Sequence, residues 1–120
     1  MRKIDLSPEA YNDLEGIKER LNTEFGEVTE KKILKSIVKD MKRLEKYPET
    51  DIKFFERFGI VTDYKCIYSN KNYLFYRIED EYIRIIRIID VRRDFMYILF
   101  GIHMISDEGE DYWENLDRAD

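Results

Sequence analysis

Residues 72–101 read NYLFYRIEDEYIRIIRIIDVRRDFMYILFG and are the most informative part of the chain, because two strand patterns are followed there by a helical one. Residues 72–78 and 81–89 are rich in β-branched and aromatic side chains. The short acidic turn 79–81 between them is typical of a hairpin connection. Both faces of the second run are largely apolar, which predicts a central strand that is covered on both sides.

After this central strand the hydrophobic period changes to that of a helix. The apolar positions of the new period are Val91, Phe95, Ile98, Leu99 and Ile102. Asp90 is a candidate N-cap for this segment, and Gly101 is a candidate C-terminal stop. The sequence therefore predicts a short third helix after the strand.

The N-terminal part of the chain predicts one strand and two helices. Residues 1–6 alternate basic and apolar side chains, as a strand with one buried face does. Ser7 is suited to cap a first helix, which reaches the turn 22–26. An apolar stripe at three- and four-residue spacing predicts a second helix from residue 27 or 29 to residue 44.

Between the second helix and the hairpin, the chain changes from an irregular loop to a strand. Phe54, Phe55 and Phe58 lie in the irregular part, where we favour a satellite hydrophobic cluster over a partner-facing loop. Residues 63–69 complete a three-stranded antiparallel meander. The predicted fold is α+β: an N-terminal strand and an antiparallel helical hairpin packed on an antiparallel sheet of about four strands, with a short C-terminal helix.

Composition limits the class of protein. The 120 residues, 43% of them hydrophobic, fit one compact domain with one modest core. Apolar runs are far shorter than the roughly 20 residues that cross a bilayer, and no signal peptide is evident, so we expect a cytoplasmic protein with no membrane partner. Cys66 and His103 are the only cysteine and histidine, so we expect neither a metal site nor a cofactor.

Charge divides the chain into two parts. The net charge is −5, but residues 107–120 contain seven acids and only one base, Arg118. Residues 1–106 contain 20 bases and 19 acids and are nearly neutral. We therefore predict a folded domain over residues 1–106 and an acidic tail over residues 107–120. Local clusters then decide what the domain attracts.

Several basic residues interrupt apolar surfaces or gather at the end of the central strand. Arg77 and Arg87 interrupt strand faces, where each either forms an ion pair with Glu79, Asp90 or a helix carboxylate, or is held to bind phosphate or a partner carboxylate. For Arg87 we favour the ion pair. Arg92 and Arg93 follow the central strand, beside the edge toward which we expect Arg77 to project, and Tyr97 lies one turn further. This pattern predicts an anion site, although arginine pairs are also common as solvated surface features.

The order of these elements resembles that of the RelE/ParE family of bacterial toxins, from Lys3 to about Ile102. The residues that carry the resemblance are IDLSPEA (4–10), KYP (46–48), YRI (76–78), EDE (79–81) and IIDVRRDFMYILFG (88–101). The resemblance implies the toxin of a type II toxin-antitoxin module, which a cognate antitoxin wraps and neutralises. It also implies a homodimer or a toxin-antitoxin hetero-oligomer.

The family has two activities, and the resemblance leaves both open. RelE-like toxins cleave messenger RNA in the ribosome and are enzymes, whereas ParE-like toxins inhibit DNA gyrase and are not. In a RelE-like endoribonuclease, Arg77 and Arg93 would hold the phosphate and Tyr97 would protonate or position the leaving group. Lys65, Arg87 and Arg92 would support binding of the substrate or partner.

Two features favour the ParE-like activity. RelE-like nucleases are usually strongly basic, whereas residues 1–106 are nearly neutral. His103 lies beyond Gly101 and resembles a tail residue more than a catalytic acid. A non-toxic binding module that acts with an antitoxin on operator DNA is a further alternative, as is an unrelated α+β domain with the same order of elements.

The acidic tail extends beyond the usual end of the family. Tyr112, Trp113 and Leu116 lie in it at helical spacing. The tail is either a disordered segment, which is the simplest interpretation, or a docking segment. As a docking segment it would pack on the sheet of its own chain, bind the antitoxin or shield the arginines.

Overall fold

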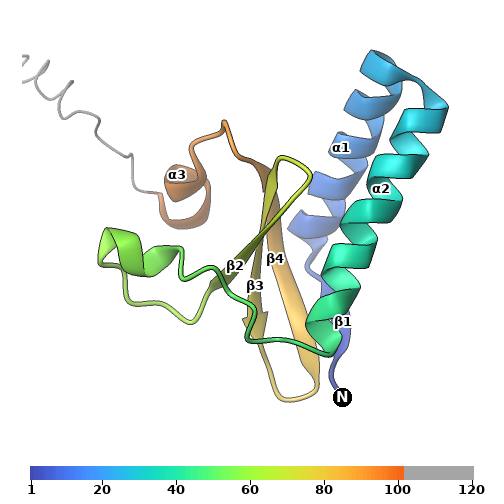
Figure 1. The fold of residues 1–120 in the computed structure, drawn as a ribbon. Coiled ribbons are helices and arrows are strands. Elements are labelled where there is room, and N and C mark those ends of the chain that lie inside the picture. The colour runs from blue at the N-terminus through green and yellow to red at the C-terminus, as the bar shows by residue number, and fades with distance from the viewer. Residues whose placement is uncertain (102–120) are drawn as a thin grey trace, which may run out of the picture.

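The computed structural model of the chain describes residues 1–101 and confirms the α+β class. The helices and strands are β1 (Lys3–Leu6), α1 (Pro8–Phe25), α2 (Glu27–Lys42), β2 (Lys65–Ser69), β3 (Asn72–Ile78), β4 (Tyr82–Asp90) and α3 (Phe95–Phe100). Two 3-10 turns, η1 (Arg43–Glu45) and η2 (Phe55–Phe58), lie between α2 and β2. The α1–α2 hairpin covers one face of the sheet, and α3 and η2 lie on the opposite side (Figure 1).

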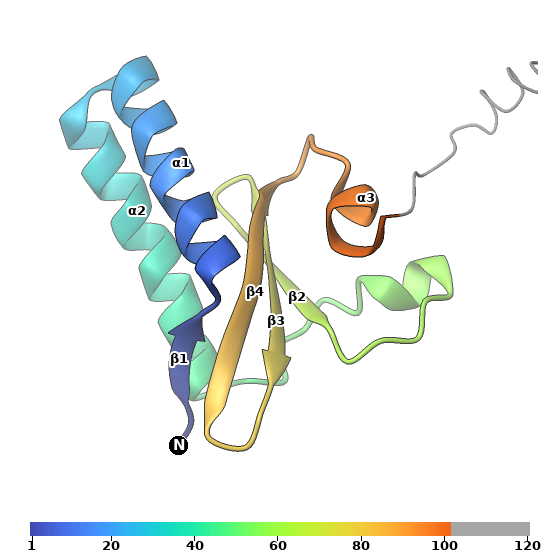
Figure 2. The same cartoon turned by 180° about the vertical axis from the view of Figure 1, so that it is seen from behind.

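The sheet has four strands in the order β1-β4-β3-β2, so β4 is central, as predicted. Strands β2, β3 and β4 form the expected antiparallel meander. Strand β1 differs from the expectation because it pairs with β4 in parallel, which makes the sheet mixed rather than wholly antiparallel. A parallel pair needs a long crossover, and the chain between β1 and β4 supplies it with the helical hairpin. The view from behind shows β1 beside β4 (Figure 2).

The predicted cap of α1 also ties this helix to the sheet. The Ser7 Oγ accepts a hydrogen bond from the Ala10 N–H at 2.9 Å and donates one to the Ile86 carbonyl at 2.8 Å. The turn between the two helices is shorter than expected, because Gly26 alone separates them. Its φ of +89° is a conformation that favours glycine. The second helix ends at Lys42 and continues as η1, close to the predicted end.

The side of the sheet that the hairpin covers, here called the hairpin face, holds an aliphatic core. Its buried residues include Ile17, Leu21, Ile37, Met41, Leu44, Leu74, Ile83, Ile85 and Ile88. Tyr76 belongs to the same cluster, and its hydroxyl donates to the Pro48 carbonyl at 2.7 Å. Apolar stripes from two helices thus meet one side of the meander, as the spacing in the sequence predicted.

The opposite side, here called the aromatic face, is covered by η2, α3 and the segments that flank them. Phe54, Phe55, Cys66, Phe75, Ile89 and Met96 are buried there, and further aromatic rings pack around them. The Phe54 ring lies 5.9 Å from Phe75 and 4.8 Å from Phe95, centroid to centroid. The interpretation of the loop phenylalanines as a satellite cluster is confirmed.

At the two ends of α3, the predicted N-cap is wrong and the predicted C-terminal stop is confirmed. Asp94, rather than Asp90, is the N-cap of α3, and its side chain accepts the Tyr97 N–H at 3.2 Å. Asp90 is the last residue of β4, and its carboxylate binds Arg92 instead. Gly101 ends the helix with a φ of +71°, as predicted. No helix within residues 1–101 is long and apolar enough to cross a bilayer.

Candidate functional site

Arg77 lies on β3 and is engaged by a nearby carboxylate. Its Nε and Nη2 donate to the Glu79 Oε2 at 2.9 and 2.6 Å. The guanidinium carbon lies 6.0 Å from the centroid of the Tyr64 ring. The hydrogen bond with Glu79 raises the pKa of Arg77. This is the ion pair that the sequence offered as one of two interpretations of Arg77.

The predicted convergence of Arg77 with Arg92 and Arg93 is wrong. In the β3–β4 pairing Arg77 faces Arg84, whereas Asn72 faces Asp90. Arg77 is therefore five residues along β3 from the end of β4 that leads to the arginine pair, which is about 16 Å of strand. The cause is the hairpin itself, because an antiparallel turn places the end of one strand beside the start of the next.

Arg87 reaches α1 rather than solvent. Its Nε and Nη2 donate to the two carboxylate oxygens of Asp13 at 2.7 and 2.8 Å, and this bidentate pair is largely buried. The Asp13 Oδ2 also accepts the Ile88 N–H at 2.9 Å. The hydrogen bond with Asp13 raises the pKa of Arg87. This arrangement matches the favoured ion-pair interpretation with a helix carboxylate, and it leaves the guanidinium little capacity for another partner.

Lys65 and Tyr97, the two remaining predicted residues outside the strand exit, lie on different elements. Lys65 is the first residue of β2, and its Nζ lies 3.6 Å from a carboxylate oxygen of Glu49. Tyr97 lies on α3 with 51% of its surface exposed. Lys65 pairs with Tyr76 and so lies beside the Arg77 end of β3, whereas Tyr97 lies on the helix that follows β4.

The exit of β4 brings together the charged residues that do converge, here called the β4-exit cluster: Arg20, Asp90, Arg92 and Arg93. Arg92 donates to both oxygens of the Asp90 carboxylate at 2.9 and 2.8 Å, and the Arg20 Nη2 lies 3.9 Å from it. The Arg92 hydrogen bond, with help from the Arg20 charge, lowers the pKa of Asp90 to about 2. Asp90 is therefore ionised at neutral pH, and it anchors the cluster.

Arg93 differs from its neighbour because its side chain has no hydrogen-bond or ion-pair partner among residues 1–101. It borders a small hollow of about 220 Å³ that Arg20 and Asn72 also line. Sequence reasoning missed both Arg20 and Asn72. No local signal in the sequence could have found them, because Arg20 looks like an ordinary solvated residue on a charged helix face.

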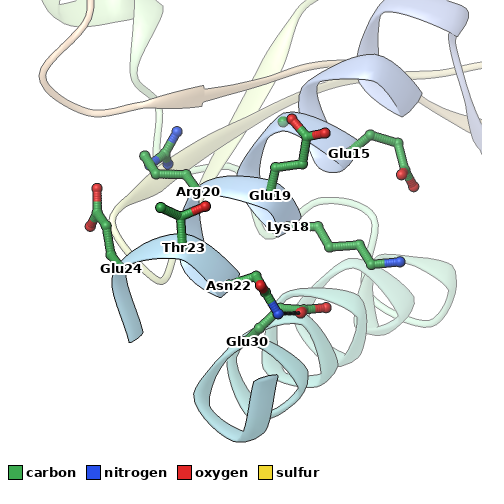
Figure 3. A pocket seen from close by; sticks show the side chains of 9 residues that line it. Glu15, Lys18, Glu19, Arg20, Asn22, Thr23, Glu24 and Glu30 are labelled. Atoms are coloured by element: carbon green, nitrogen blue, oxygen red, sulfur yellow. Dashed lines mark hydrogen bonds between the residues drawn. The ribbon is translucent and has the colours of Figure 1, made fainter. Parts of the chain in front are cut away.

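A larger hollow than this one lies elsewhere and has a different character. It has a volume of about 750 Å³ and lies along the distal part of the helical hairpin. Figure 3 shows carboxylates of Glu15, Glu19, Glu24 and Glu30 around it, with the Asn22 amide directed at Glu30. An acid-rich hollow of this kind does not suit an anion. Within residues 1–101 no three histidine, cysteine or acidic residues are arranged to hold a metal ion.

A helical hairpin on a mixed four-stranded sheet, with a basic cluster at the exit of the central strand, defines a small α+β domain of the RelE/ParE type. A family model described as the ParE toxin of type II toxin-antitoxin system, parDE, matches residues 4–95. The chain belongs to this family and is therefore a type II toxin, which implies a cognate antitoxin as partner.

The chain was also compared with solved structures and with curated proteins. A solved structure described as "Chromosomal ParDE TA system from P. aeruginosa" is similar over 75% of this chain and 96% of that chain, with 16% identity and a TM-score of 0.56. At this identity the likeness concerns the fold. No curated protein matches the sequence.

Two predictions concern residues beyond the described part of the chain, which ends at Gly101. They are the boundary between residues 1–106 and the acidic tail 107–120, and the interpretation of His103 as a tail residue.

Proposed function

We propose that this chain inhibits DNA gyrase and is neutralised by a cognate antitoxin. The family match over residues 4–95 carries the proposal, because the matching model is described as the ParE toxin and gyrase inhibition is the activity of ParE-like toxins. In this proposal Arg92, Arg93 and Tyr97 contact the target. The exposed positions of these three residues, on the exit of β4 and on α3, support that role.

The separation of the predicted catalytic residues supports gyrase over messenger RNA as the target. Cleavage of RNA by its 2′-hydroxyl needs a base, an acid and a group that neutralises the phosphate, all within contact of one phosphate. Arg77 is engaged by Glu79, and it lies at the other end of β3 from Arg93. Within residues 1–101 these two arginines do not face one phosphate together.

The test is a supercoiling assay with purified gyrase, run beside a cell-free translation assay. We expect the wild-type protein to block supercoiling and to leave translation intact, and addition of the antitoxin to reverse the block. Arrest of translation with normal supercoiling would instead indicate the RelE-like nuclease. A protein that affects neither process, yet binds antitoxin tightly, would indicate the non-toxic binding module.

Two matched variants locate the target-facing surface. Arg93→Ala removes an arginine without a side-chain partner among residues 1–101, and we expect it to raise the concentration for half-inhibition about tenfold. Arg77→Ala removes an arginine that Glu79 already engages, and we expect inhibition to be nearly unchanged. Equal loss in both variants would contradict the assignment of the target surface to the exit of β4.

A further inference from the structure

A groove opens between the helical hairpin and the turn from β2 to β3, next to the β4-exit cluster. Here called the exit groove, it has a volume of about 560 Å³. Its apolar wall includes Phe25, Ile33, Tyr68 and Val91. Phe25 and Tyr68 are 59% and 55% exposed, so the groove presents large apolar side chains to solvent. Exposed apolar surface of this kind marks a place where another segment packs.

The rim of the exit groove is basic. Arg20, Lys71 and Arg92 line it, against the carboxylates of Glu24 and Asp90. Arg93 adds a further positive charge in the adjoining hollow, which shares Arg20 and Asp90 with the groove. An occupant with acidic side chains around an apolar strip therefore fits both the wall and the rim.

A buried acceptor lies at the base of the groove. Asn72 is only 3% exposed, and its Nδ2 donates to the Asn70 carbonyl at 3.0 Å. Its Oδ1 is buried with no hydrogen-bond partner among the described residues. Asn72 lines both the groove and the adjoining hollow. Because an unpaired buried acceptor is costly, the site favours an occupant that brings an N–H or O–H donor.

We propose that the acidic tail of the same chain, residues 107–120, binds the exit groove. Its seven acids face the basic rim, and its apolar residues Tyr112, Trp113 and Leu116 pack on the apolar wall. The indole N–H of Trp113 and the hydroxyl of Tyr112 can each donate the hydrogen bond that the Asn72 Oδ1 does not receive from residues 1–101. The tail is thus complementary to the groove in charge, in apolar surface and in hydrogen bonding.

The length of the chain permits this contact. Val91 lines the groove, and only three residues and the six-residue helix α3 separate it from Gly101. Extended and helical geometry limit that separation to about 25 Å. The residues between Gly101 and Trp113 span up to about 40 Å when extended, so Trp113 reaches the groove of its own chain.

The consequence is that the free toxin shields its own apolar groove. A partner that uses this groove has to displace the tail first. Because the contact is partly electrostatic, it weakens as ionic strength rises.

Trp113 makes the proposal directly measurable, because it is the only tryptophan in the chain. The experiment compares tryptophan emission and acrylamide quenching of the purified full-length protein with those of a synthetic peptide of residues 107–120. We expect the protein to emit at shorter wavelength and to be quenched several-fold less. Emission and quenching equal to those of the free peptide would overturn the proposal.

Matched variants place the tail in the groove rather than elsewhere. Phe25→Ser and Lys71→Glu change exposed groove residues, so both proteins should fold normally by circular dichroism. We expect both to restore peptide-like quenching. Lys35→Glu makes the same charge change at an exposed position of α2 that does not line the groove, and we expect no effect. Equal effects of the two lysine variants, or none from the groove variants, would overturn the location.

Dilution separates a contact within one chain from a contact between two copies. The proposal predicts the same emission across a hundredfold range of protein concentration, with a monomeric mass throughout. Loss of the blue-shifted emission on dilution would mean that the tail binds a second copy, and this result would also overturn the proposal.

Discussion

The two faces of the sheet are covered in different ways. On the hairpin face, helices of 18 and 16 residues pack regular apolar stripes onto the strands. On the aromatic face, a 3-10 turn and a six-residue helix are held by contacts between rings. Long helices bring their own backbone hydrogen bonds, whereas short irregular segments depend on side-chain packing for their order. We therefore expect the hairpin face to supply most of the stability and the aromatic face to be easier to perturb.

The largest effect should come from the hairpin face. Ile85→Ala truncates a fully buried residue of the central strand, whose neighbours are strands on both sides. We expect a loss of about 4 kcal/mol in the free energy of unfolding, because a cavity forms among packed side chains. Urea denaturation followed by circular dichroism measures it, with the exposed Val61→Ala as a neutral control. A loss below about 1 kcal/mol would contradict the assignment of stability to this face.

A change on the aromatic face should be smaller and more local. The Phe54 ring contacts Phe55, Phe58, Tyr73, Phe75 and Phe95. We expect Phe54→Ala to cost about 3 kcal/mol. Hydrogen exchange should show loss of protection in α3 while α1 and α2 remain protected.

The half-exposed Phe58 offers a control in the same turn. Phe58→Ala should cost less than Phe54→Ala and leave α3 protected. Uniform loss of protection over both faces in Phe54→Ala would show that the two faces unfold as one unit.

A third change tests how the hairpin is attached to the central strand β4. Asp13→Asn removes the charge that pairs with Arg87, and it leaves a largely buried guanidinium without its carboxylate. We expect a loss of about 2 kcal/mol in the free energy of unfolding. The comparison is Asp5→Asn, which breaks a more exposed pair with Arg84 and should cost about 0.5 kcal/mol. Similar costs for the two variants would contradict the special role of the buried pair.

The smallest effect should appear only in acid. The pKa of Asp90 is about 2 in the folded protein, below its ordinary value of 3.8, chiefly because Arg92 donates hydrogen bonds to it. A lowered pKa stabilises the fold above the ordinary value, and this stability is lost as the pH falls from about 4 toward 2. Because Arg92 is exposed, we expect only about 1 kcal/mol.

Thermal melting between pH 7 and pH 2 checks the contribution of Asp90. In Asp90→Asn the melting temperature should fall less steeply than in the wild type between pH 4 and pH 2. Asp80→Asn, in the exposed turn before β4, should keep the wild-type profile. A wild-type profile in Asp90→Asn would mean that the β4-exit cluster adds nothing to stability.

Sequence reasoning succeeded where the signal was local and failed where it depended on register. The cap at Ser7, the stripe of α2 and the limits of β3 followed from neighbouring residues. The meeting of Arg77 with Arg93 did not occur, because the hairpin register carries them to opposite ends of β3. The parallel pairing of β1 also lay beyond the sequence, since an isolated strand pattern does not state which neighbour it joins or in which direction.

The choice of N-cap for α3 also depended on strand register rather than on neighbouring residues. A carboxylate before a helical pattern is a reasonable N-cap, and two such residues, Asp90 and Asp94, were available. The ladder with β3 extends as far as Asp90, so this residue belongs to the sheet and Asp94 takes the cap. Pairing with Asn72, which is remote in sequence, decided between them.

The class of fold, the order of the elements, the central place of β4 and the aromatic cluster could be predicted from the sequence, because periodicity, caps and turns are properties of adjacent residues. Which charged side chains meet depended on how the strands and helices pack together. This packing joined Arg87 to Asp13 and brought Arg20 to Asp90, and it left the Asn72 Oδ1 without a hydrogen-bond donor among residues 1–101. The physical reason is that strand register and helix packing set these distances, and both depend on the whole chain.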